Sequence, residues 1–144
     1  MTDKLDMLWS KTPSRGYAAL KELLAISRES GAVYPYMEQF IEMLGSDSSY
    51  FRTRALALIA ANAKWDTNCR IDENIDAILS HITDPKPVTA RQFIKDLPAL
   101  AAAKPDLRRD ILSALRRADT QRYPLSMRPL VERDIRNAIA EIES

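Results

Sequence analysis

The sequence predicts an all-α protein made of stacked helix pairs, and two observations carry this prediction. The first is a fixed interval of 37 positions, which separates Arg54, Arg91 and Arg128. Apolar series keep the same interval: Leu56, Phe93 and Leu130; Ala57, Ile94 and Val131; Ile41, Ile78 and Leu115; Phe51, Val88 and Leu125. Such a period is typical of proteins in which each helix pair buries its apolar stripe against its neighbours. The second observation is that no segment alternates apolar and polar residues as a strand does.

Length and composition predict one ordinary globular domain. The chain has 144 residues, of which 46% are hydrophobic and 28% charged. We expect a single domain over residues 1–144, with residues 1–12 as an N-terminal arm. The net charge of +1 gives no general attraction to nucleic acid or membrane. Cys69 has no second cysteine to pair with, and we interpret it as an inert loop thiol.

The N-terminal residues predict a cytoplasmic protein. The segment MTDKLDMLW contains acidic residues and lacks the apolar stretch of a signal peptide. No apolar run approaches the ~20 residues that span a bilayer, so we expect no membrane contact.

Helical spacing and cap signals predict each element in the first half of the chain. Leu5, Leu8 and Trp9 indicate a short helix within residues 2–10. Thr12 and Pro13 predict the start of a helix over 14–29, with Thr12 as cap and Pro13 in the first turn. Its apolar stripe is Tyr17, Leu20, Leu23, Leu24 and Ile26. Further helices are expected over 34–44, ending at Gly45, and over 50–64.

The second half of the chain predicts four more segments. Asp72 is expected to cap a helix that ends near residue 83, before the turn Asp84-Pro85-Lys86-Pro87. A helix over 88–103 contains Pro98, which predicts a kink or a break near residues 96–97. Helices over 106–118 and 127–142 complete the chain.

One run resembles a known repeat family. The pattern Leu44-x-x-Asp47-(x)3-Phe51-Arg52-x-x-Ala55 resembles the HEAT/armadillo class, which has Asp in the turn and a Val-Arg pair opening the second helix. In the next repeat Asp84 and Val88 match, but the arginine is displaced to Arg91. In the third, Leu125 and Arg128 match, while Gln121 replaces the aspartate.

The resemblance covers roughly residues 14–143 and implies a fold. It implies a short right-handed α-solenoid of about three to four helix pairs, similar to small bacterial HEAT-like proteins without an established activity. Helices 33–44, 72–83 and 106–118 would form the outer row. Helices 14–29, 50–64, 88–103 and 126–143 would form the inner row.

Arg54, Arg91 and Arg128 are the most specific polar pattern. They could form a stripe that binds carboxylates or phosphates through planar guanidinium groups. Alternatively, Arg54 and Arg91 could bond to Asp47, Asp84 and loop carbonyls and tie turns together. The aspartate seven residues before each of them favours the structural interpretation.

Two other features allow a nucleic-acid interpretation. Trp65 and Asp66 could form a base-binding pocket, as in the HEAT-like DNA alkylation repair glycosylases. Because the two residues are adjacent in a turn, Trp65 fits better as a lid on the core. A possible phosphate-binding stripe contains Arg108, Arg109, Arg116, Arg117 and Arg122. The acidic residues among them, Asp106, Asp110 and Asp119, favour a solvated helix face instead.

No catalytic or metal-binding pattern is recognisable. His81 is the only histidine, and metal sites need three or more convergent ligands. We expect neither enzymatic activity nor a cofactor. The favoured function is a scaffold or adaptor that binds a protein or peptide on its inner helical face. The alternative is a nucleic-acid-binding module related to the HEAT-like repair proteins.

Overall fold

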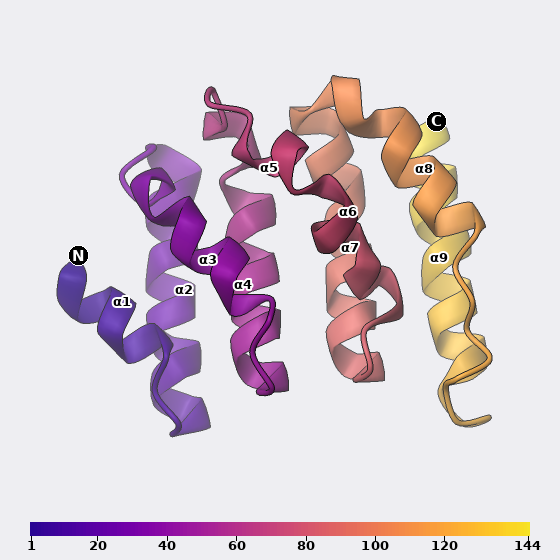
Figure 1. The fold of residues 1–144 in the computed structure, drawn as a ribbon, viewed down its shortest axis with the longest axis horizontal. Helices are drawn as coiled ribbons and strands as arrows, with labels where there is room; N and C mark the ends of the chain where they lie inside the picture. The colour runs from indigo at the N-terminus through magenta and orange to yellow at the C-terminus, as the bar shows by residue number, and fades with distance from the viewer. The chain divides into compact units, whose positions relative to one another are not determined.

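A computed structural model describes residues 1–144, and every regular element in it is a helix (Figure 1). Nine α-helices and four 3₁₀ helices follow one another without a strand, which confirms the all-α class. None of the helices combines the length and the apolar character needed to cross a membrane. The chain divides into two compact units, Met1–Glu73 and Asn74–Ser144, each with its own core.

The first unit is organised around α2 and α4. Its elements are α1 Thr2–Leu8, α2 Pro13–Glu29, η1 Tyr34–Tyr36, α3 Met37–Met43, α4 Ser49–Ala61, η2 Ala63–Trp65 and α5 Arg70–Glu73. α2 packs against both α1 and α4, and α3 packs against α4 (Figure 1). Its fully buried side chains include Leu8, Leu23, Phe40, Leu56 and Ile59.

Short-range chemistry sets where two helices of this unit begin. Pro13 lies in the first turn of α2, where its missing N–H breaks no helical hydrogen bond, so the predicted start is confirmed. The Thr12 side chain forms no capping bond. α4 begins after Ser48, whose Oγ accepts a hydrogen bond from the backbone N–H of Phe51 at 3.3 Å.

The N-terminal segment is docked on the first unit. The Trp9 ring lies 6.5 Å from the Phe40 ring and 5.6 Å from the Phe51 ring, centroid to centroid. Its Nε1 donates a hydrogen bond to Gln39 at 3.0 Å. In α1 itself Leu5 and Leu8 are buried, so this helix contributes to the core of the first unit.

The second unit is organised around α7 and α9. Its elements are α6 Ile75–Leu79, η3 Ser80–Thr83, α7 Pro87–Ala103, η4 Pro105–Leu107, α8 Arg108–Arg116 and α9 Arg128–Glu143. α7 packs against η3 and α9, and α8 packs against α9. Its core includes Ile78, Phe93, Ile94, Leu97, Leu100, Ile111, Leu115 and Val131.

Two expected helix features are wrong. Asp72 does not begin a helix; it lies inside α5, and the segment expected as one helix over 72–83 is divided among α5, α6 and η3. Of the kink or break expected at Pro98, the break is wrong, because α7 is continuous from Pro87 to Ala103. Leu97 and Leu100 beside Pro98 are fully buried, and we attribute the unbroken helix to this packing.

The apolar residues of the 37-residue series differ in burial. Leu56 and Phe93 are each 1% exposed. Val88 and Leu125 are 51% and 77% exposed, and Phe51 in the same series is half-buried. That series therefore does not form a core layer. Tyr17, which was expected in the apolar stripe of α2, is also exposed.

Candidate functional site

Arg54 is the most buried arginine of the 37-residue series, at 4% exposed. From α4, its Nη1 donates hydrogen bonds to the carbonyl oxygens of Leu8 at 2.7 Å and Ser10 at 3.1 Å. These carbonyls lie at the end of α1, where unpaired C=O groups carry partial negative charge. Burial lowers the pKa of Arg54. Arg54 therefore caps α1 and ties it to α4.

Aromatic rings and a glycine complete the surroundings of Arg54. Its Cζ lies 5.7 Å from the ring centroids of both Tyr50 and Phe51. On α2, Gly16 leaves space for the guanidinium, because a Cβ at this position would lie 2.2 Å from Arg54 Cζ. The cation is thus enclosed by helix carbonyls, two rings and the backbone of α2.

Arg91 forms an ion pair between α7 and α9. Its Nε donates to Asp134 Oδ2 at 2.6 Å. The Asp134 side chain is 5% exposed and that of Arg91 is 23% exposed. The hydrogen bond to Asp134 raises the pKa of Arg91. Because a buried carboxylate needs a cation or hydrogen-bond donors, this pair fixes the two longest helices of the second unit together.

Arg128 holds the loop that precedes α9. Its Nη2 donates to the carbonyl oxygens of Gln121 at 3.0 Å and Tyr123 at 3.2 Å. Its Nε is buried without an acceptor.

The arginines of the series thus bond to three unrelated sets of groups. The expected bonds from Arg54 and Arg91 to Asp47 and Asp84 are not formed, so this prediction is wrong. Bonds to loop carbonyl oxygens are observed for Arg54 and Arg128.

Trp65 covers the end of α2. Its Nε1 donates to the carbonyl oxygen of Ser27 at 2.7 Å, and the ring lies 3.6 Å from the position of a Cβ on Gly31. Lys64 Nζ lies 5.3 Å from the ring centroid. These contacts agree with a lid on the core.

Asp66 is a structural cap beside this lid. The carboxylate is 5% exposed and accepts hydrogen bonds from Tyr34 Oη at 2.5 Å and from the backbone N–H groups of Arg70 and Ile71 at 3.0 Å. Burial, together with the bond to Asp66, raises the pKa of Tyr34 to about 12. Asp66 starts α5 in the way expected of Asp72. Its lone pairs are engaged, so it offers little to a bound base.

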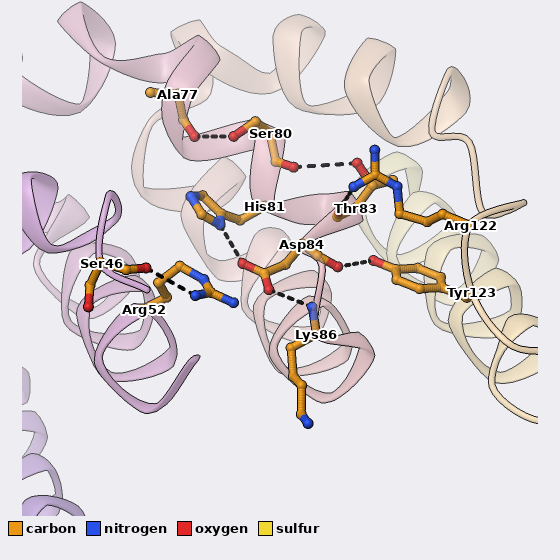
Figure 2. Close-up of polar contacts among 10 residues, drawn as sticks. All are labelled: Ser46, Arg52, Ala77, Ser80, His81, Thr83, Asp84, Lys86, Arg122 and Tyr123. Atoms are coloured by element: carbon orange, nitrogen blue, oxygen red, sulfur yellow. Dashed lines mark hydrogen bonds and ion pairs between the residues drawn. The ribbon is translucent and has the colours of Figure 1, made fainter. Parts of the chain in front are cut away.

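Asp84 organises the turn before α7, as Figure 2 shows. Asp84 is 1% exposed as a whole residue. Its carboxylate contacts His81 Nδ1 at 2.6 Å and accepts a hydrogen bond from the backbone N–H of Lys86 at 2.8 Å. The Asp84 carbonyl accepts from Tyr123 Oη at 2.6 Å. Burial, reinforced by the nearby Asp84 charge, raises the pKa of Tyr123 to about 12. These bonds join the turn to the loop before α9.

Arginines gather around one cavity in the second unit. The cavity has a volume of about 550 Å³, and we name it the arginine cleft; its lining is Arg108, Arg109, Leu112, Ser113, Arg116, Arg117 and Glu143. Arg116 pairs with Glu143 of α9, and Arg117 Nη1 donates to Ser113 Oγ at 2.9 Å. Four cations and one carboxylate give this lining a positive charge, so it suits an anionic ligand.

One carboxyl group has a shifted pKa without a catalytic setting. Burial raises the pKa of Asp96 on α7 to about 6. Asp96 does not line the arginine cleft, and acid–base catalysis requires a carboxyl within hydrogen-bond reach of a substrate. No group of three or more His, Cys, Asp or Glu side chains is placed to hold a metal ion.

Sequence reasoning named the cleft arginines but missed Asp134 and Glu143. Asp134 interrupts the apolar stripe of Val131, Ile135 and Ala138, and a buried partner could have been inferred from that position. Glu143 carries no such signal, because acidic residues near a helix end are common on surfaces.

Comparison of the chain with protein-family models, curated proteins and solved structures finds no match. Function must therefore be inferred from the side chains and their surroundings.

Proposed function

We propose that this protein is a non-enzymatic helical-repeat scaffold of the HEAT/armadillo type, which binds a protein or peptide on its inner row of helices. The resemblance in the turn sequences assigns α2, α4, α7 and α9 to that row. In this proposal the helices supply a fixed surface and the partner supplies the specificity.

Two exposed tyrosines carry the proposal. Tyr17 on α2 and Tyr50 on α4 are 60% and 59% exposed, and their helices pack against each other. Tyrosine is enriched in protein interfaces because it offers a large contact area and a polar tip at low entropic cost. Two exposed tyrosines on neighbouring helices are therefore reasonable anchors for a partner.

The groups around these tyrosines support a preorganised surface. Arg54 lies beneath Tyr50, fixed by the end of α1 and by the backbone of α2. Lys21 Nζ lies 5.5 Å from the Tyr17 ring centroid. A surface that is already ordered loses less conformational entropy when a partner binds.

Exposed apolar residues also occur in the second unit. Val88 lies in the first turn of α7, and Leu125 lies just before α9. Each unit thus exposes large apolar side chains on or next to helices of the proposed inner row.

Site-specific crosslinking tests the proposal. A photoreactive phenylalanine analogue at position 17 or 50 should crosslink one protein partner in a lysate, and the same analogue at exposed position 42 on α3, outside the proposed inner row, should not. The double variant Tyr17→Ala/Tyr50→Ala should lose the partner while keeping its melting temperature. Crosslinks that are the same from all three positions, or none from positions 17 and 50, would contradict the proposal.

Nucleic-acid binding is the second candidate, and the arginine cleft is the observation that favours it. Nucleic-acid affinity that falls steeply with salt is the signature to measure. The cleft lining contains no aromatic residue on which a base could stack, and Asp66 beside Trp65 is engaged in capping. We therefore rank it below protein binding.

A further inference from the structure

We propose that the arginine cleft is a docking site for an acidic peptide segment of a partner protein. The cleft lies in the second unit, on residues other than the tyrosines discussed above. This inference therefore does not depend on the surface around Tyr17 and Tyr50.

The spacing of the arginines matches an extended acidic chain. Arg109 and Arg116 are seven residues apart on α8, which corresponds to about 10 Å along a helix. An extended peptide covers this length with about three residues. Two or three acidic side chains of such a segment could therefore reach the guanidinium groups together.

Arg108 and Arg109 are unfavourably placed to stabilise α8. They occupy its first turn, where the helix dipole disfavours cations. Both are exposed, and neither forms an ion pair. Two unpaired cations in an electrostatically unfavourable position are better explained by a ligand than by folding.

Glu143 indicates which chemical group the cleft accepts. Its carboxylate pairs with Arg116 within the lining, so one acidic side chain of this chain already occupies part of the cleft. The other arginines leave donors for additional carboxylates, which planar guanidinium groups bind through paired hydrogen bonds.

The lining favours a peptide over nucleic acid. Leu112 supplies an apolar floor for the aliphatic part of a Glu side chain, and stacking side chains are lacking. Asp106, Asp110 and Asp119, which are close in sequence to these arginines, interrupt any longer basic track that a phosphate backbone would follow, whereas a short acidic peptide needs only the cleft itself.

Calorimetric titration of the full chain with an acetylated hexaglutamate peptide tests this site. Arg108→Glu/Arg109→Glu should weaken binding about tenfold or more, since two contacts become repulsive. The matched control Lys95→Glu/Arg133→Glu changes the net charge equally at exposed positions outside the cleft and should weaken it less than about twofold. Glu143→Gln should strengthen binding about two- to threefold, because it removes the competing carboxylate.

Three outcomes would overturn the proposal: absence of binding to the wild type, equal weakening by both double variants, or tighter cleft-dependent binding of a single-stranded oligonucleotide with six phosphates. The last outcome would assign the cleft to nucleic acid. Arg108→Gln/Arg109→Gln provides a milder test should the charge reversal unfold the chain. Tyr17→Ala/Tyr50→Ala should leave peptide binding unchanged, which separates this site from the proposed scaffold surface.

Discussion

The guanidinium of Arg54 occupies the space that any side chain at Gly16 would need. A Cβ at position 16 would lie 2.2 Å from Arg54 Cζ and 2.4 Å from both terminal nitrogens. In an exposed helix interior, alanine is more favourable than glycine by about 1 kcal/mol. α2 therefore keeps a residue of poor helix propensity so that Arg54 can reach the end of α1.

Gly16→Ala should lower the free energy of unfolding by about 2 kcal/mol, because the added methyl group displaces Arg54 from the Leu8 and Ser10 carbonyls. In an Arg54→Ala background the same substitution should instead stabilise by about 0.5–1 kcal/mol through helix propensity. Urea denaturation followed by circular dichroism measures both values.

Ala18→Gly is the matched control for this pair, since position 18 is exposed on the same helix. It should cost about 0.5–1 kcal/mol with or without Arg54. An effect of Gly16→Ala that is the same in both backgrounds would rule out the steric relationship.

Arg91→Ala should lower the melting temperature by about 5–10 °C, because it leaves the buried Asp134 carboxylate without its cation. Adding Asp134→Ala should recover part of this loss, since no uncompensated charge then remains. Differential scanning calorimetry provides the comparison, with exposed Arg133→Ala as the control. A melting temperature that Arg91→Ala leaves unchanged would show that the pair contributes nothing.

Asp96→Asn should stabilise the protein at neutral pH and not in acid. Burial raises the pKa of Asp96 to about 6, whereas the unfolded carboxyl ionises near pH 4. The folded state therefore loses stability as the pH rises from about 4 to 6, and the penalty stays constant above that range. Asparagine avoids the penalty, so we expect a gain of about 2–3 kcal/mol at pH 7.5 that fades to zero near pH 4.

Denaturant titrations at a series of pH values give this difference directly. Glu141→Gln removes an exposed carboxylate from α9 and serves as the control. A stabilisation by Asp96→Asn that does not vary between pH 4 and 7.5 would mean that the carboxyl is not desolvated.

Tyr123→Phe should destabilise by about 1 kcal/mol at neutral pH, because the hydrogen bond to the Asp84 carbonyl is lost. At alkaline pH the Tyr123→Phe variant should instead be more stable than the wild type. The pKa of Tyr123 is raised to about 12, so the unfolded phenol ionises first and the wild type loses stability from about pH 10 to 12. Phenylalanine has no such loss.

Chemical denaturation at pH 7 and pH 11.5 is sufficient for this comparison. Tyr17→Phe, at an exposed position, should not change stability at pH 7. If Tyr123→Phe remains equally destabilising at pH 11.5, then the phenol is not held in its neutral form by the fold.

Local signals in the sequence predict where helices begin, but they do not predict which distant residues bond to each other. Pro13 and Pro87 lie in the first turns of α2 and α7 as expected, because proline acts on its own backbone. The bond from Arg54 to Leu8 spans 46 positions, and that from Arg91 to Asp134 spans 43. Helix packing determines such pairs, and no local sequence pattern predicts them.

The cap of α5 illustrates the same limit. Asp72 and Asp66 are both acceptable cap residues by type. Asp66 is held in the capping position by a hydrogen bond from Tyr34, 32 positions earlier in the chain, which no local pattern indicates. For the arginine cleft, the sequence contained the cations, but only the packing of α8 on α9 brings Glu143 among them.

The two tryptophans, Trp9 and Trp65, both belong to residues 1–73. Trp9 is packed between aromatic rings and Trp65 is bonded to Ser27, so both lose their surroundings when the first unit unfolds. Intrinsic emission excited at the indole band therefore reports on that half of the chain alone. An emission transition that precedes or follows the loss of total helix would reveal halves that melt as separate cooperative blocks.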